Sequence, residues 1–295
     1  MPLDRSLEAH PISRRQALAG IAGAAALLGL AGQQEALAAG PRDTLPRLRV
    51  IRSRAGVLEA SFTATTTPAR LMGVPTDGLY TYDQQFVAPL LVIDPGDRLS
   101  LTVRNRTPID LNTHLHGFHV TPEGDGDNVF LSVPPGEDLT TRLTIPRDHS
   151  RGLNWYHPHV HGVTNESVFK GLAGPFFVRG GVETLPGIRS LVRRLLVVKA
   201  HQLVPDVTPP TMVPVANVVS ASQVFTVNGA LTPNLVMRPG ETQLWALANM
   251  TPGAFLRLEL SGHSFTVLAE DGNPAFVPWS AAELDVPRGS ASRCW

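Results

Sequence analysis

Short segments in which apolar and polar residues alternate, separated by turns that contain Gly and Pro, recur from residue 48 onward. Residues 99–103 and 139–145 alternate in this way, whereas residues 90–93 and 195–198 are unbroken apolar runs. Alternation with a period of two is typical of strands with one buried face, and short apolar runs are typical of fully buried strands. The pattern therefore predicts an all-β protein built from many short strands, as in β-sandwiches.

Other local signals predict how these strands are connected. Residues 48–54 and 57–65 alternate on either side of Ala55-Gly56, which predicts a hairpin. Residues 164–170 are expected to form a short helix. The Pro- and Val-rich stretch 204–216 is expected to be a loop.

A weak internal repeat indicates two domains of the same kind. The turn Asp94-Pro95-Gly96-Asp97 has a counterpart in Arg238-Pro239-Gly240-Glu241, and an apolar-rich segment ending in Asn follows each turn. Such recurrence predicts that the two halves share one fold. The expected domains are residues 45–180 and residues 190–295, with the chain restarting around Gly180-Gly181.

The N-terminal segment, residues 1–38, is expected to be an export signal. Arg14-Arg15 precedes an uncharged, Ala- and Gly-rich apolar run, and Ala36-Leu37-Ala38 has the small-X-small pattern of a cleavage site. This arrangement is typical of a twin-arginine signal peptide and predicts a periplasmic or extracellular protein. The alternative is an N-terminal membrane anchor, for which a run of about 14 residues is short, because spanning a bilayer takes about 20.

Charge and cysteine content narrow the class of protein further. Basic and acidic residues balance at 25 each, which argues against nucleic acid or an anionic membrane surface as the partner. Cys294 is the only cysteine, so no intrachain disulfide can form. After the signal, no segment is long and apolar enough to be expected to cross a bilayer.

Four of the ten histidines form two His-X-His pairs, His114 with His116 and His157 with His159. Residues two apart on a strand point to the same face, so each pair projects two imidazoles from one side. Neutral imidazole is a common ligand of copper, zinc and iron, so we expect the pairs to meet across neighbouring strands and hold metal. The alternative is that the four histidines are unrelated surface residues.

These pairs and their neighbours resemble the N-terminal copper motifs of the multicopper oxidases, the family of laccases, ascorbate oxidase and bacterial cuprous oxidases. The segments that carry the resemblance are Thr113–His119, Trp155–Gly162, Gly171–Gly174, Val227–Gly229 and Leu268–Gly272. The resemblance covers about residues 45–280. It implies two cupredoxin-like, Greek-key (plastocyanin-like) domains, the first of which carries the copper ligands.

Carried over to this sequence, the family pattern implies a copper role for each of the four histidines. His114 would bind the type 2 copper, His116 and His157 one type 3 copper, and His159 the other. In the family these three ions form the cluster at which dioxygen is reduced to water. The resemblance also implies that Trp155 and Tyr156 are packing residues that hold the second pair in place.

The remaining histidines are expected to lie outside this centre. His161 shares the phase of the second pair but falls outside the ligand pattern, and His119 would face away from the first pair. We expect His149, His201 and His263 to be structural or solvent-exposed.

The resemblance also implies what this sequence lacks. The family cluster uses eight histidines, of which four are present here, and the type 1 copper motif with its His-Cys-His triplet is not found, since Cys294 has no neighbouring histidine. Residues 290–295 do not resemble the family. We therefore expect a truncated second domain and no turnover by this chain alone, and we assign no catalytic residue.

Three functional hypotheses remain open at this point. The first is a copper-dependent oxidoreductase with dioxygen as acceptor, of which this chain supplies part. The second is a non-catalytic exported protein that binds copper or a protein partner. The third is an inactive remnant whose half-built second sandwich exposes a sheet edge. The reducing substrate is not identified, because electron entry belongs to the type 1 copper.

Overall fold

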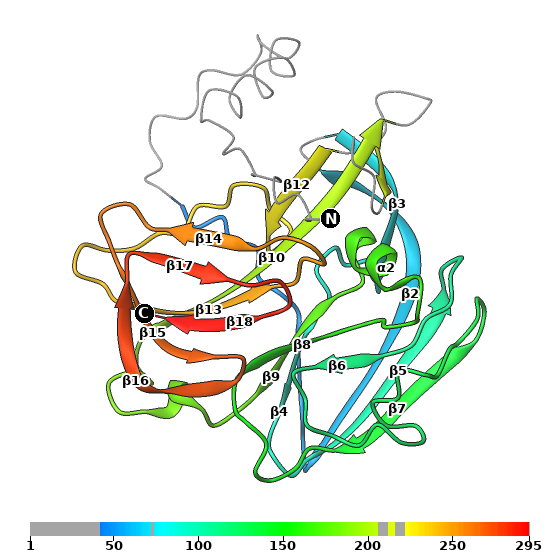
Figure 1. Cartoon of the computed structure of the whole chain (residues 1–295), viewed down its shortest axis with the longest axis horizontal. Helices are drawn as coiled ribbons and strands as arrows, with labels where there is room; N and C mark the ends of the chain where they lie inside the picture. The colour runs from blue at the N-terminus through cyan, green and yellow to red at the C-terminus, as the bar shows by residue number, and fades with distance from the viewer. Residues whose placement is uncertain (1–41, 72–73, 206–211, 216–221, 295) are drawn as a thin grey trace, which may run out of the picture. The chain divides into compact units, whose positions relative to one another are not determined.

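Strands supply nearly all the regular structure of the described residues, which are 42–71, 74–205, 212–215 and 222–294 of the computed structural model (Figure 1). The expected signal peptide, residues 1–38, lies outside them. The strands are, in chain order, β1 (Val50–Arg52), β2 (Val57–Leu71), β3 (Val74–Tyr82), β4 (Leu90–Ile93), β5 (Arg98–Arg106), β6 (His114–His116), β7 (Asp138–Thr144), β8 (Leu153–His157), β9 (Gly174–Val178), β10 (Val192–Pro205), β11 (Met212–Val215), β12 (Ser222–Val227), β13 (Gln243–Asn249), β14 (Leu256–Glu259), β15 (Phe265–Glu270), β16 (Asn273–Ala281), β17 (Glu283–Val286) and β18 (Ala291–Cys294).

The prediction of an all-β fold is confirmed. The described residues form a five-stranded sheet in the order β1-β4-β9-β8-β6, an eleven-stranded sheet that runs from β16 to β7, and the pair β14-β17. The expected helix is also confirmed as α2 (Thr164–Lys170), and a 3-10 turn covers Val182–Thr184. In the part of the chain that the structure describes, no helix combines the length and the apolar character needed to cross a membrane.

The first half is a sandwich whose core lies between the five-stranded sheet and strands β2, β3 and β5. Aromatic rings from both layers meet there, with Phe62 of β2 at 5.5 Å from Tyr82 of β3 and 5.9 Å from Tyr156 of β8, centroid to centroid. The Tyr156 hydroxyl donates to the carbonyl oxygen of Pro89 at 2.8 Å. These contacts anchor β8 in the core one residue before the second His pair begins.

The expected hairpin over residues 48–65 is confirmed only as a two-residue turn, across which Arg54 and Val57 exchange backbone hydrogen bonds. The chain does turn at Ala55-Gly56, but β1 pairs in parallel with β4, whereas β2 pairs with β3 and β5 in the other sheet. Both segments have one apolar face, and these faces meet across the core, where Ile51 packs against the cluster that contains Leu58. Alternation predicts a strand with one buried face but does not identify its partner.

The expected loop over residues 204–216 is also wrong in part. Its first two residues end β10, and residues 212–215 form β11, which pairs antiparallel with β10. β11 also pairs with β3 through Met212 and Thr76, which carries the eleven-stranded sheet across both expected domains. The domain boundaries themselves stay a prediction.

The internal repeat has a structural basis in two buried asparagines, Asn105 and Asn249. The Asn105 amide donates to the carbonyl oxygens of Ile109 and Val133, and the Asn249 amide donates to three carbonyl oxygens in the equivalent turns. The side-chain oxygen of each accepts the N–H of the second residue on, Thr107 in the first half and Thr251 in the second. The same hydrogen-bonding arrangement around a buried asparagine, called the asparagine device below, therefore recurs in both halves of the chain.

The tail that did not resemble the family forms a strand. β18 lies between β15 and β13 and pairs antiparallel with both. β18 is therefore not an edge strand. The edge of the eleven-stranded sheet next to β15 is β16, where Phe276 and Val277 are exposed.

Candidate metal centre

The two His pairs lie side by side because β6 and β8 are neighbouring antiparallel strands. His114 pairs directly with His157, and His116 pairs with Trp155. Cross-strand partners project from the same face of a sheet, so these four side chains gather on one side. Leu115 and Tyr156 alternate to the opposite face and enter the core of the first half.

Three of the four expected ligands converge. One ligand nitrogen from each of His114, His116 and His157 lies within 4.8 Å of the others. The ring centroid of His159 is 5.1 Å from that of His114 and 5.7 Å from that of His157. His159 therefore borders the cluster, and its backbone N–H is held by the Asn112 side-chain oxygen.

His157 is prepared to act as a neutral ligand. Its Nδ1 bonds to the carbonyl oxygen of Pro158 at 2.9 Å, so this nitrogen carries the proton. Its Nε2 is buried and has no hydrogen-bond partner among the described residues. Burial, with a smaller effect of the neighbouring imidazoles, lowers the pKa of His157 well below its usual value. A buried imidazole nitrogen with a free lone pair fits a bound metal ion.

His114 is oriented by a carboxylate that sequence reasoning missed. Nδ1 of His114 lies 3.0 Å from Oδ1 of Asp127, and the Leu115 backbone N–H donates to the same oxygen at 3.0 Å. A carboxylate only accepts, so Nδ1 carries the proton and Nε2 is free to ligate. The sequence offers three acidic residues in this Gly-rich loop, Glu123, Asp125 and Asp127, and no local signal shows which one turns inward.

Trp155 packs against two of the imidazoles, in agreement with its expected packing role. Its ring is stacked on His157 with centroids 4.2 Å apart and on His116 with centroids 4.8 Å apart. Burial and the proximity of His114 lower the pKa of His116. The two imidazoles beside the indole are thus kept neutral, the form that binds metal.

The other histidines lie outside this cluster. His161, His119 and His263 are exposed. His149 is buried, and its Nε2 accepts the backbone N–H of His119. His201 is fully buried, its Nδ1 bonds to the carbonyl oxygen of Phe169, and burial lowers its pKa to about 3.

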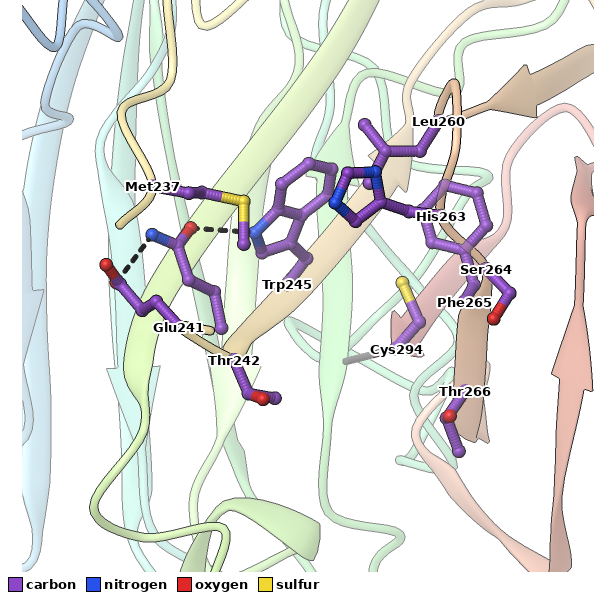
Figure 2. A pocket seen from close by; sticks show the side chains of 11 residues that line it. Met237, Glu241, Thr242, Trp245, Leu260, His263, Ser264, Phe265, Thr266 and Cys294 are labelled. Atoms are coloured by element: carbon purple, nitrogen blue, oxygen red, sulfur yellow. Dashed lines mark hydrogen bonds between the residues drawn. The ribbon is translucent and has the colours of Figure 1, made fainter. Parts of the chain in front are cut away.

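Cys294 lies in a separate cavity of about 300 Å³, together with residues distant in sequence. Figure 2 shows its side chain on β18 near Phe265, with His263, Trp245 and Met237 on the surrounding walls. Burial raises the pKa of Cys294 to about 12. The residue is therefore a neutral thiol, which is a poor metal ligand compared with a thiolate.

Known proteins resemble this chain over most of its length. A family model described as multicopper oxidase matches residues 63–182. Multicopper oxidase MmcO of Mycobacterium tuberculosis is 27% identical over 296 aligned positions, which cover 89% of this chain and 57% of that protein. Laccase-3 of Arabidopsis thaliana is 32% identical over 102 positions, or 33% of this chain and 17% of that protein.

Solved structures agree on the fold. A multicopper oxidase McoA variant from Aquifex aeolicus superposes with a TM-score of 0.69 at 22% identity, covering 86% of this chain and 57% of that one. A laccase from Pediococcus acidilactici superposes with a TM-score of 0.70 at 18% identity, covering 87% and 56%. This chain thus spans little more than half the length of these proteins. Together with the family match over residues 63–182, the comparisons show that this chain is similar to multicopper oxidases in sequence and in fold.

Proposed function

We propose that this chain binds copper through His114, His116, His157 and His159 and supplies half of the trinuclear centre of a multicopper oxidase. The observation that carries the proposal is the convergence of three imidazole nitrogens within 4.8 Å, one of which is buried and unpartnered among the described residues. Similarity to multicopper oxidases supports copper over other metals that imidazole binds.

In this proposal His114 holds the type 2 copper, His116 and His157 hold one type 3 copper, and His159 holds the other. The side chains present are matched to that task. Asp127 orients His114, and the carbonyl oxygen of Pro158 fixes the tautomer of His157. Copper bound here would supply one-electron redox chemistry toward dioxygen.

We further propose that the chain does not turn over by itself. The family centre uses eight imidazoles and takes its electrons through a type 1 copper, whereas this proposal places four imidazoles here. In this proposal, dioxygen is reduced only at the complete trinuclear centre. The reducing substrate and any partner act on that complete centre and not on this chain alone.

Copper titration of the purified chain tests the proposal. The full chain is expected to bind about one or two cupric ions without the intense blue band of a copper–thiolate site. His157→Ala is expected to abolish tight binding. His161→Ala is the matched control, because His161 lies in the same segment but is exposed and outside the cluster. Equal affinities of the two variants would refute the ligand assignment.

The export signal is a separate proposal, supported by the sequence of residues 1–38. We propose export by the twin-arginine route to the periplasm or the outside of the cell. Changing Arg14 and Arg15 together to Lys is expected to retain the protein in the cytoplasm, whereas the same change at Arg47 and Arg49 is expected to leave export intact. Export of the first variant at the normal level would contradict the proposal.

A further inference from the structure

Trp155 connects the proposed copper ligands to the second half of the chain. It stacks on His116 and His157, and it belongs to a buried cluster with Val197 and Ala248 of strands β10 and β13. Its indole N–H donates to the carbonyl oxygen of Gly289 at 3.0 Å. One side chain thus contacts two imidazoles and a turn more than 100 positions away in the sequence.

The turn that contains Gly289 is held rigidly. The Asn249 amide donates to the carbonyl oxygens of Val286 and Pro287, and the Gly289 N–H donates to the Asn249 carbonyl oxygen. This is the second copy of the repeated asparagine device. In the first half the equivalent turn is tied to Asn105 through the N–H of Gly136.

The same turn also packs directly on a proposed ligand. Gly289 has a φ of +73°, and a Cβ placed on it would lie 3.3 Å from Cε1 and 3.5 Å from Nε2 of His116. A glycine therefore serves two needs here, a left-handed backbone and a close approach to the imidazole. A side chain at this position would approach Cε1 of the imidazole more closely than most Cβ contacts allow, so the ring or the turn would have to shift.

We propose that the turn Pro287–Ser290 is a positioning element of the copper centre, which sets His116 by direct contact and His157 through Trp155. This inference rests on the proposed copper function. The second half of the chain then contributes to the metal centre by packing against His116 and by one hydrogen bond to Trp155. Groups outside the ligand set that orient the ligands typically contribute about 10- to 100-fold to metal affinity.

Two glycine variants isolate this contact. Gly289→Ala and Gly262→Ala place the same methyl group at the same φ of +73°, but a Cβ at Gly262 has nothing within 4 Å. Both variants therefore carry the same backbone strain, and only the first presses on His116. The measurements are the proton NMR shifts of the His116 and His157 rings in the metal-free chain, which stacking on Trp155 displaces, and the cupric-ion affinity.

In Gly289→Ala both ring shifts are expected to move, and copper affinity is expected to fall about tenfold or more relative to Gly262→Ala. Equal shifts and equal affinities in the two variants would overturn the inference. The metal-free shifts decide the positioning even if the wild-type chain binds no copper, a result that would contradict the proposed function alone.

A tryptophan pair covers the case in which Gly289→Ala does not fold. Trp155→Phe and Trp245→Phe each remove one indole N–H···O bond of 3.0 Å, to Gly289 and to Gln243 respectively. Only the first bond ties the turn to the imidazoles. Weaker copper binding by Trp155→Phe than by Trp245→Phe is expected, and equal binding would count against the positioning role.

Discussion

His157 combines burial with an unused hydrogen-bond acceptor, a combination that is unfavourable unless something occupies the nitrogen. A buried polar atom without a partner costs about 1–3 kcal/mol. The proton on Nδ1 is committed to a backbone carbonyl, so Nε2 cannot be satisfied by changing tautomer. A metal ion is the ligand that this arrangement suits, since metal binding requires the neutral ring that burial maintains.

Replacing Asp127 tests the orientation of His114. Asp127→Ala frees the His114 ring and leaves the Leu115 N–H without its acceptor, so cupric-ion affinity is expected to fall about 10- to 100-fold. Asp125→Ala is the matched control, because Asp125 is 56% exposed and forms a surface ion pair, whereas Asp127 is 9% exposed. Isothermal titration should show this difference, and indistinguishable affinities would remove Asp127 from the centre.

The burial of Lys199 leads us to expect a pH dependence of stability that is independent of the metal. It is fully buried, its Nζ donates to the carbonyl oxygens of Gly171 and Ala173, and burial lowers its pKa from 10.5 to about 7. Below about pH 7 the folded and unfolded chains both carry the proton, so the full penalty of burying the charge applies. Between about pH 7 and pH 10.5 only the unfolded chain keeps it, so the free energy of unfolding rises with pH.

Lys199→Met removes this titration. Urea unfolding of wild type and variant across pH 6 to 10 is expected to show a wild-type slope steeper by up to about 1.4 kcal/mol per pH unit above pH 7. The stability of the variant relative to wild type is therefore expected to decline as the pH rises. Parallel profiles would show that burial does not lower the pKa of Lys199 in the folded chain.

At the residue scale, the sequence predicted that the two histidine pairs would meet, but it did not predict the residues that orient them. The His-X-His spacing carries its own geometry, because two residues apart on a strand means one face. Asp127, Asn112 and Gly289 act across loops and between halves of the chain, where spacing carries no such information. The inward turn of Asp127 depends on the fold of its whole loop.

Among the elements, the register of β6 against β8 matters most for the site. Pairing His114 with His157 places all the relevant rings on one face, and a shift by one residue would turn the imidazoles of one strand to the opposite side. The core contacts of Tyr156 fix that register from the other face of β8. Packing in the first sandwich therefore determines whether the rings can share a metal.

Element boundaries were predicted well and strand partners poorly. The helix Thr164–Lys170 matches its expected residues, and residues 139–145 fall within one position of β7. The expected hairpin does not extend beyond its turn, because alternation describes one strand at a time, whereas pairing depends on which core each face meets. β11 was missed because Pro-rich composition argues against strands, while pairing with β10 overrides that local signal.

The hydrogen bonds of the Asn249 side chain lead us to expect a specific loss of stability when this residue is replaced. Asn249→Ala removes one donor from each of the carbonyl oxygens of Val286, Pro287 and Ala254, the first of them in a buried bond, so the free energy of unfolding is expected to fall by about 2–4 kcal/mol. Asn273→Ala removes an exposed amide and is expected to change stability by less than about 0.5 kcal/mol. Chemical denaturation measures both, and similar losses would contradict the structural role of Asn249.

For the molecule as a whole, the two halves of the chain share the asparagine device but contribute differently to the proposed metal centre. The first carries the histidine pairs on β6, on β8 and directly after β8, and the second places the Gly289 turn against His116. The chain aligns with 57% of the multicopper oxidase MmcO and with 57% of the McoA variant, so both halves have counterparts in these longer proteins. The fold class was predictable because strand-and-turn patterning is local, whereas the joint between the halves was not.

Pulsed electron paramagnetic resonance of the chain loaded with cupric ion tests the central claim most directly, because it counts the imidazole nitrogens bound to each copper. The account predicts modulation from at least two coordinated imidazoles in the wild type, loss of that signal in His157→Ala, which no longer binds copper tightly, and no change in His161→Ala. A spectrum without coordinated imidazole, or one that His157→Ala leaves unaltered, would contradict it.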